Sequence, residues 1–119
     1  MFYSASMHAN EWTNSVVMMK FVEDFAEAYT NHTEILGYNI RQIFTARTIY
    51  LMPMVNPDGV DLVLNNIPRS SPFYREARRI ANQYEEIPFP NGWKANIRGV
   101  DFKRHQPEKS SNHLYLRVS

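Results

Sequence analysis

The strongest constraint on the fold is a nearly continuous apolar run, Thr-Ile-Tyr-Leu-Met-Pro-Met-Val, at residues 48–55. A strand with one solvated face alternates apolar and polar residues, whereas a run without alternation is typical of a strand covered on both faces in a parallel sheet. Pro53 has no amide hydrogen to donate, so we expect the hydrogen-bonded ladder to end near it. The run therefore predicts an α/β protein built around a buried parallel strand.

Patterns on either side of this run support that class. Apolar residues recur at three- and four-residue spacing over residues 10–29 and again over 70–84, which predicts two amphipathic helices. Residues 1–6 are typical of the end of a strand, and residues 40–45 favour a short helical turn. The Asn-Pro-Asp-Gly segment at 56–59 favours a tight turn. The order strand, helix, strand is that of an α/β unit.

The number of strands is too small for a complete domain of this class. A parallel sheet needs several strands covered by helices, and the sequence offers two or three. We therefore predict a partial piece of a mixed or parallel sheet with flanking helices. Such a piece exposes strand edges and apolar faces, including Trp12, Phe21, Ile49 and Leu51, and we expect it to self-associate.

Composition removes several functional classes. The 119 residues suit one domain, and the absence of cysteine excludes a disulfide scaffold, a thiolate zinc finger, an iron–sulfur site and a cysteine nucleophile. No apolar run approaches the roughly 20 residues of a membrane span. Residues 1–6 show no signal peptide, and the sequence does not specify a compartment.

Charge is distributed unevenly along the chain. Residues 1–60 hold three basic and six acidic side chains, whereas residues 61–119 hold ten basic and six acidic ones. A basic half suits an anionic substrate, a nucleic acid or a solvated face. The cations are scattered and no aromatic-interleaved basic motif occurs, so we expect no nucleic-acid partner.

His8 and Glu11 form the sharpest local feature. They stand three residues apart where the first strand gives way to a helix, a spacing that can direct both side chains to one side. An imidazole nitrogen and a carboxylate oxygen are two of the donor types that zinc accepts. The same spacing also arises where a glutamate stabilises a helix N-terminus beside an ordinary histidine, so both interpretations stand.

A second candidate is the segment at residues 92–101, where Lys94 and Arg98 stand four residues apart. Two cations so placed can clamp a carboxylate or stabilise an oxyanion. They can equally face solvent.

Three segments in this order carry a family resemblance. They are Ser-Met-His-Ala-Asn-Glu-Trp at 6–12, Tyr-Leu-Met-Pro-Met-Val-Asn-Pro-Asp-Gly at 50–59 and Trp-Lys-Ala-Asn-Ile-Arg-Gly-Val-Asp at 93–101. Over about residues 1–101 the chain resembles the zinc carboxypeptidases of the carboxypeptidase A type. It is most similar to their bacterial γ-D-glutamyl-L-diamino acid endopeptidases, which cut cell-wall peptides and are cytoplasmic or cell-wall associated.

The resemblance implies specific roles. His8 and Glu11 match the first two zinc ligands, so the implied cofactor is Zn²⁺ and the implied substrate is a peptide. Lys94 stands where the family usually has an arginine that stabilises the oxyanion, which keeps the charge but loses the bidentate fork. Arg104 matches an arginine that binds the substrate's carboxylate, although the residues around it depart from the family pattern.

The same resemblance leaves two roles unmatched. The family's third zinc ligand, a histidine, and its catalytic glutamate have no counterpart in a similar context. We therefore expect residues 1–101 to be a partial peptidase domain and residues 102–119 a divergent tail, as a change of reading frame would produce. We expect the chain alone to be inactive. The alternative is a non-catalytic peptide- or anion-binding remnant that uses Lys94, Arg98 and Arg104.

Overall fold

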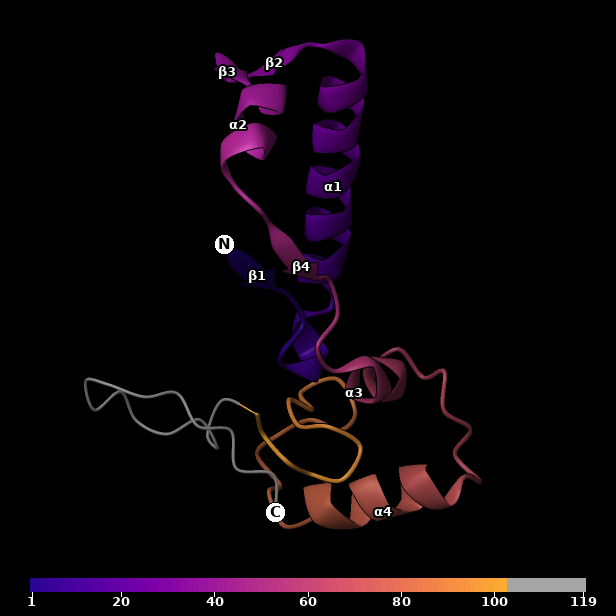
Figure 1. Ribbon diagram of the computed structural model, residues 1–119. Helices are drawn as coiled ribbons and strands as arrows, with labels where there is room; N and C mark the ends of the chain where they lie inside the picture. The colour runs from indigo at the N-terminus through magenta and orange to yellow at the C-terminus, as the bar shows by residue number, and fades with distance from the viewer. Residues whose placement is uncertain (103–119) are drawn as a thin grey trace, which may run out of the picture.

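The computed structural model describes residues 1–102, which form short strands and helices in alternation (Figure 1). In chain order the elements are β1 (Phe2–Ser4), the 3₁₀ helix η1 (Ala9–Glu11), α1 (Thr13–Asn31), β2 (Glu34–Ile35), β3 (Tyr38–Asn39), α2 (Ile40–Ala46), β4 (Tyr50–Met52), α3 (Pro57–Val63) and α4 (Pro72–Ala81). The mixed α/β class is as predicted. No helix within residues 1–102 is long and apolar enough to cross a membrane.

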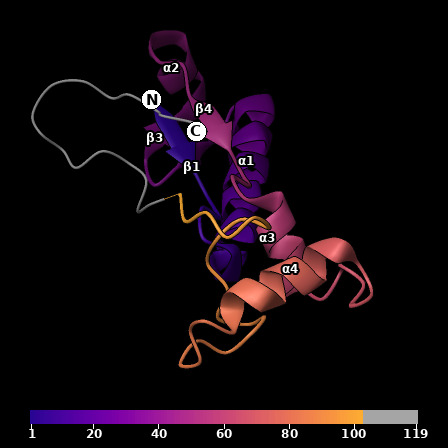
Figure 2. The ribbon, with the colours of Figure 1, turned by 90° about the horizontal axis from the view of Figure 1, so that it is seen from below.

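The apolar run supplies β4, which pairs in parallel with β1 (Figure 2). Phe2 lies opposite Tyr50, and the ladder ends at Met52, immediately before Pro53, as expected. The expected burial of this strand on both faces is wrong for the described chain, since Tyr50 is 63% exposed. Residues 1–102 contribute only these two strands to the sheet, so each strand leaves one edge and part of each face uncovered.

The long helix predicted over residues 10–29 is confirmed as η1 followed by α1. Its apolar stripe is less buried than the pattern suggests, because Val16 and Met19 are 61% and 50% exposed. Further along α1, the ring of Phe25 packs edge to face with the ring of Phe44 of α2, and the two ring centroids are 6.3 Å apart. Periodicity thus located the helix, but a stripe is buried only where another element faces it.

Between α1 and α2 lies a small antiparallel hairpin, β2–β3, that the sequence did not signal. Its two-residue turn places Leu36 at φ 51° and Gly37 at φ 79°. Positive φ at both central residues is the type I′ geometry, for which Asn-Gly rather than Leu-Gly is the usual sequence. Asn39 then caps α2, its side chain accepting a hydrogen bond from the Gln42 amide.

The Asn-Pro-Asp-Gly segment begins a helix, so its interpretation as a tight turn is wrong. Asn56 is the N-cap of α3, and its Oδ1 accepts a hydrogen bond of 3.1 Å from the Gly59 amide. Pro57 occupies the first helical position, where its fixed φ and missing amide hydrogen are favourable. A capping asparagine followed by proline suits both a turn and a helix start, and the apolar residues after Gly59 decide between them by packing.

The hydrophobic core lies where η1, α3, α4 and residues 84–102 meet, in the lower half of Figure 1. Tyr74, Phe89 and Trp93 stack edge to face there, with successive centroids 5.4 and 5.7 Å apart. Its buried members are Ala9, Leu62, Val63, Tyr74, Ala77, Ala81 and Trp93. The Cα radius of gyration is 18.3 Å, against about 13 Å for a compact domain of 100 residues. The described chain is therefore extended, with its core at one end.

Candidate metal centre

A short turn between β1 and η1 sets the position of His8. Ser6, at its centre, adopts a left-handed φ of 50° and is buried. The Ser6 hydroxyl donates to the Glu11 carbonyl at 3.2 Å and shares a hydrogen bond of 2.6 Å with Ser15. Ser15 in turn donates to the Pro53 carbonyl, which joins the start of α1 to the end of β4. The turn is thus tied to both the helix and the sheet.

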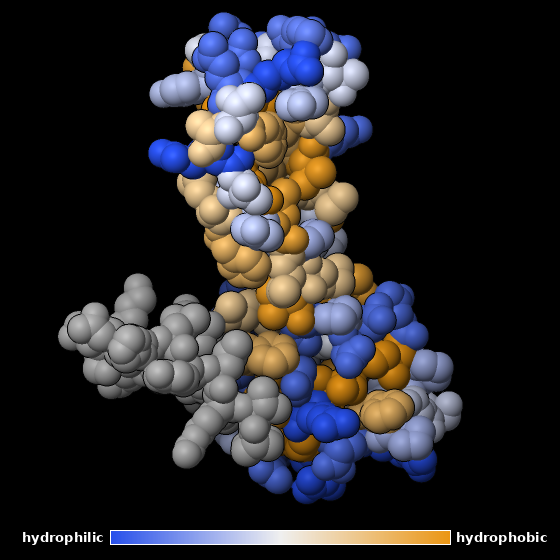
Figure 3. Space-filling model, in the orientation of Figure 1, coloured by the Kyte–Doolittle hydropathy of each residue, from blue (hydrophilic) through white to orange (hydrophobic). Residues whose placement is uncertain are grey.

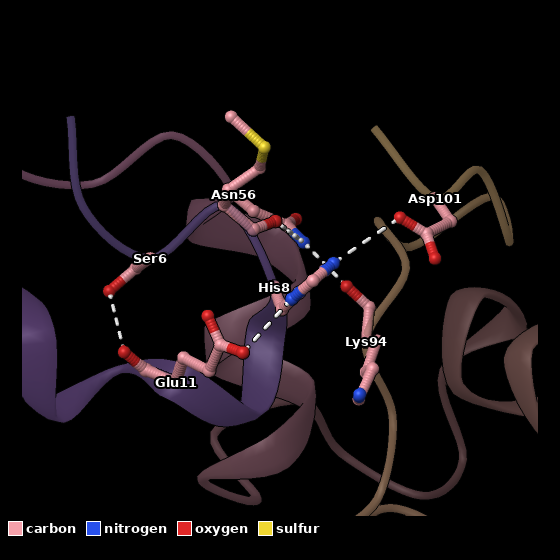
Figure 4. Close-up of polar contacts among 7 residues, drawn as sticks. Ser6, His8, Glu11, Asn56, Lys94 and Asp101 are labelled. Carbon is pink, nitrogen blue, oxygen red and sulfur yellow. Dashed lines mark hydrogen bonds and ion pairs between the residues drawn. The ribbon is translucent and has the colours of Figure 1, made fainter. Parts of the chain in front are cut away.

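The structure brings His8 and Glu11 together, as their spacing predicts (Figure 4). His8 Nδ1 lies 3.0 Å from Glu11 Oε1. The other ring nitrogen, Nε2, faces Asp101 Oδ1 at 3.5 Å. The His8 side chain is 11% exposed, whereas that of Glu11 is 46% exposed, so the pair opens to solvent on the glutamate side.

This arrangement fits a metal ligand pair. Each ring nitrogen of His8 faces a carboxylate: in the tautomer with the proton on Nε2, toward Asp101, the lone pair of Nδ1 points toward Glu11, whereas in the other tautomer Nδ1–H donates to Glu11 Oε1. In the first tautomer Nδ1 and Oε1 are both acceptors, and two acceptors 3.0 Å apart suit a metal cation bound between them. Nitrogen and oxygen donors of this kind suit zinc.

The donor set is nevertheless partial within the described chain. Catalytic zinc sites generally take three protein ligands. Among residues 1–102, no group of three or more His, Cys, Asp and Glu side chains is placed to hold a metal ion. His8 and Glu11 therefore fit as two donors, with Asp101 behind the imidazole.

Asp101 is the functional candidate that sequence reasoning missed. It ends the third of the resembling segments, but nothing in its local context singles out its role. Its contact with His8 joins the two ends of the described chain and arises only when residues 84–102 fold back over η1 (Figures 1 and 4).

The backbone of Lys94 lies next to η1, close to the His8–Glu11 pair. The Ala9 amide donates to the Lys94 carbonyl at 3.1 Å, which fixes this part of the chain beside η1. The Lys94 side chain is exposed, and its ammonium has no hydrogen bond or ion pair with another residue in the described range. It is therefore available to a ligand.

Of the two arginines predicted to bind substrate, only Arg98 lies within the described residues. Arg98 is exposed in a turn built on Asn96, whose Oδ1 accepts from the Arg98 and Val100 amides at 3.0 Å each. Gly99 closes that turn at φ 81°. Arg104 lies outside the described residues.

The family model for zinc carboxypeptidases matches residues 1–116. The chain belongs to the zinc carboxypeptidase family. The resemblance found in the sequence is thereby confirmed. The prediction that a divergent tail starts after Asp101 stays a prediction; the family match continues beyond that residue.

The chain is also similar to three individual curated proteins. The chain is 42% identical to γ-D-glutamyl-L-diamino acid endopeptidase 1 of Lysinibacillus sphaericus over 107 residues, which are 90% of this chain and 26% of the relative. It is 36% identical to the uncharacterized protein YqgT of Bacillus subtilis (strain 168), over 87% of this chain and 27% of that protein. It is 24% identical to carboxypeptidase E of Caenorhabditis elegans, over 89% of this chain and 18% of the relative.

The chain thus spans about a quarter or less of the length of these curated relatives. No solved structure matches it significantly.

Proposed function

We propose that this chain carries two of the zinc-binding residues of a peptidase that hydrolyses γ-D-glutamyl-diamino acid bonds in cell-wall peptides. The observation that carries the proposal is the His8–Glu11 pair with Asp101 behind the imidazole, in a member of the zinc carboxypeptidase family. The substrate class is supported by the name of the relative from Lysinibacillus sphaericus.

Each side chain has a definite task in this proposal. His8 Nδ1 and Glu11 Oε1 would hold the zinc ion, and Asp101, which faces Nε2, would orient the imidazole ring. A bound zinc ion supplies Lewis acidity and lowers the pKa of water. Lys94 stabilises negative charge that develops on the scissile carbonyl oxygen, as a point charge rather than a bidentate fork. Arg98 and Arg104 are proposed to bind anionic groups of the substrate.

Zinc binding is the direct test. Calorimetric titration of the chain with Zn²⁺ should show one site, and His8→Ala and Glu11→Gln should each weaken it by tenfold or more. His32→Ala is the matched control, because His32 is exposed at the far end of α1 and contacts Arg41 instead. Zinc binding by His8→Ala that equals binding by the unaltered chain would exclude these ligands.

We further propose that the 119 residues alone do not turn over substrate. The support is that the resemblance assigns two of the three zinc donors and no general base. Release of diaminopimelate from a γ-D-glutamyl-diaminopimelate peptide should not exceed that of the His8→Ala control. A zinc-dependent rate clearly above that control would refute the proposed inactivity.

A non-catalytic, peptide-binding role is the second candidate. It is favoured by the exposed Lys94 and Arg98, neither of whose charged groups has an ion pair within residues 1–102. In this case the chain binds the anionic peptide in the presence of a chelator, and Lys94→Glu with Arg98→Glu abolishes binding. Binding that requires zinc and is lost in His8→Ala favours the peptidase centre instead.

Self-association is proposed for the uncovered sheet. Phe2, Tyr50 and Met52 are 62%, 63% and 44% exposed on strands that each have an unpaired edge. Beside β4 an apolar hollow of about 450 Å³ opens between α1 and α2, visible as hydrophobic surface in Figure 3. A second copy of the chain can cover these surfaces. Sedimentation should show a mass that rises with concentration, and a monomer at every concentration would exclude the proposal.

A further inference from the structure

We propose that Asn56 is a positioning residue of the candidate metal centre, holding the Lys94–Asp101 segment in place against His8. The inference rests on the proposed function, because the centre that it concerns is the zinc-binding pair. Asn56 is only 2% exposed. It lies where three parts of the chain meet (Figure 4): the turn before η1, the start of α3, and the Lys94–Asp101 segment, called the Lys94 segment below.

The Asn56 side chain is bonded to all three segments. Its Oδ1 accepts from the Gly59 amide at 3.1 Å, which caps α3. Its Nδ2 donates to the Met7 carbonyl at 3.3 Å and to the Ala95 carbonyl at 3.0 Å, with the Lys94 carbonyl at 3.5 Å. The Met7 carbonyl belongs to the peptide group that joins Met7 to His8. One amide group thus connects the backbone next to a metal ligand with the backbone of the proposed oxyanion residue.

The backbone of Asn56 is already fixed independently of these side-chain bonds. Its amide donates to the Ser6 carbonyl at 3.2 Å, and the Val55 amide donates to the Ala5 carbonyl at 3.0 Å. These two bonds extend the contact between β1 and β4 beyond the strands. The backbone bonds therefore hold Asn56 in place without its side chain. What the side chain adds is the attachment of the Lys94 segment.

The chemistry of the three partners requires an amide at this position. Two carbonyls need donors and one N–H needs an acceptor, and asparagine offers both. An aspartate of the same shape would set a carboxylate against two carbonyl oxygens, whereas leucine would leave three buried polar groups unpaired. Glycine at position 59 leaves space for this amide, because a Cβ added at Gly59 would lie 2.6 Å from both the Ala95 carbonyl oxygen and Asn56 Nδ2.

Asp101 and Lys94 depend on this attachment, whereas Glu11 does not. The Lys94 segment leads directly to Asp101, which faces His8 Nε2. The backbone of Glu11 is held on the other side of His8, where its carbonyl accepts a hydrogen bond from the Ser6 hydroxyl. Loss of the Asn56 bonds should therefore separate Asp101 and Lys94 from His8 while the His8–Glu11 pair persists.

The variant that tests this is Asn56→Asp, with Asn66→Asp as the matched control. Both substitutions are isosteric and add the same charge, but the Asn66 amide is exposed and donates to Asp61 at 3.0 Å. Hydrogen exchange of the Ala9 amide reports on the Lys94 segment, because that amide donates to the Lys94 carbonyl. We expect this exchange to accelerate at least about tenfold in Asn56→Asp and not in Asn66→Asp. Zinc affinity should fall about tenfold or more in the first variant alone, as for the loss of a group that orients a metal ligand.

Unchanged Ala9 exchange and zinc affinity in a folded Asn56→Asp chain would overturn the proposal. If the variant does not fold, the role of Asn56 is tested by hydrogen exchange in the unaltered chain. The side-chain amide protons of Asn56 should then exchange at least about tenfold more slowly than those of Asn66, and equal rates would refute the role. If the unaltered chain binds no zinc, the proposed function fails, whereas Ala9 exchange in the variant still decides whether Asn56 positions the segment.

Discussion

Two regions of the molecule bury their apolar residues to very different extents. The core region comprises η1, α3, α4 and residues 84–102, and its Ala9, Leu62 and Ala77 are fully buried. The helical arm comprises α1, α2 and the β2–β3 hairpin, and its Val17 and Leu36 are 68% and 92% exposed. Figure 1 shows the helical arm above and the core region below, and apolar residues are exposed along the helical arm in Figure 3.

The difference follows from how many elements face each other. In the core region two helices, η1 and a folded-back segment enclose one cluster, so each apolar side chain has neighbours on several sides. In the helical arm the rings of Phe21, Phe25 and Phe44 contact one another in a single row along an open hollow. A similar apolar content therefore stabilises the two regions unequally. The His8 side of the candidate centre lies toward the core region, which is the better packed of the two.

The largest expected effect is a core truncation. Leu62→Ala removes a fully buried side chain, and we expect it to lower the free energy of unfolding by about 2–5 kcal/mol. Val17→Ala, in the exposed part of the helical arm, should change it by less than about 0.5 kcal/mol. Urea unfolding followed by the fluorescence of Trp93, which is 7% exposed, measures both. Equal effects would remove the proposed contrast.

A smaller effect is expected where the helical arm does make contacts. Phe44→Ala removes edge-to-face contacts with Phe25 and Tyr29, at 6.3 and 5.9 Å between centroids. At about 0.5–1.5 kcal/mol for each of the two pairs, opening α2 should cost about 1–3 kcal/mol less than in the unaltered chain. Hydrogen exchange of the α2 amides measures this locally, and the α4 amides should not change. Accelerated exchange in α4 would show that the two regions unfold together.

The smallest effect concerns a surface ion pair on α4. A hydrogen bond from Arg79 lowers the pKa of Glu76, and Glu76 raises the pKa of Arg79. Because the pKa of Glu76 is lower in the folded state, the pair stabilises at neutral pH, and this contribution is lost as pH falls through that folded pKa. Glu76→Gln should thus lower the melting temperature slightly at neutral pH and not at low pH, and added salt should reduce the difference.

The control for this pair is Glu85→Gln. Glu85 is exposed in the loop after α4 and has no ion pair within residues 1–102. Its substitution should leave the melting temperature unchanged at both pH values. A pH-independent loss in Glu76→Gln would mean that the side chain acts through packing rather than charge.

Local patterns predicted much of the secondary structure and failed at specific points. The helix over 70–84 is confirmed as α4, because its periodicity and its Ser71-Pro72 start are local properties. The β2–β3 turn was missed because Leu36 is an unfavourable residue for its left-handed conformation. The start of α3 was misread because Asn56 and Pro57 suit a turn and a helix equally. Burial of Leu62 against η1 decides for the helix.

The sequence by itself determined the family, through its three resembling segments, and the proximity of His8 and Glu11, which a spacing of three residues is enough to produce. Only the tertiary structure decided which residues support that pair. Asn56 is bonded to carbonyls 49 and 39 residues away in the chain, and Asp101 meets His8 across nearly the whole described range. Such partners leave no periodic or local signal, because their contacts form only when β4, α3 and the Lys94 segment pack around the turn that carries His8.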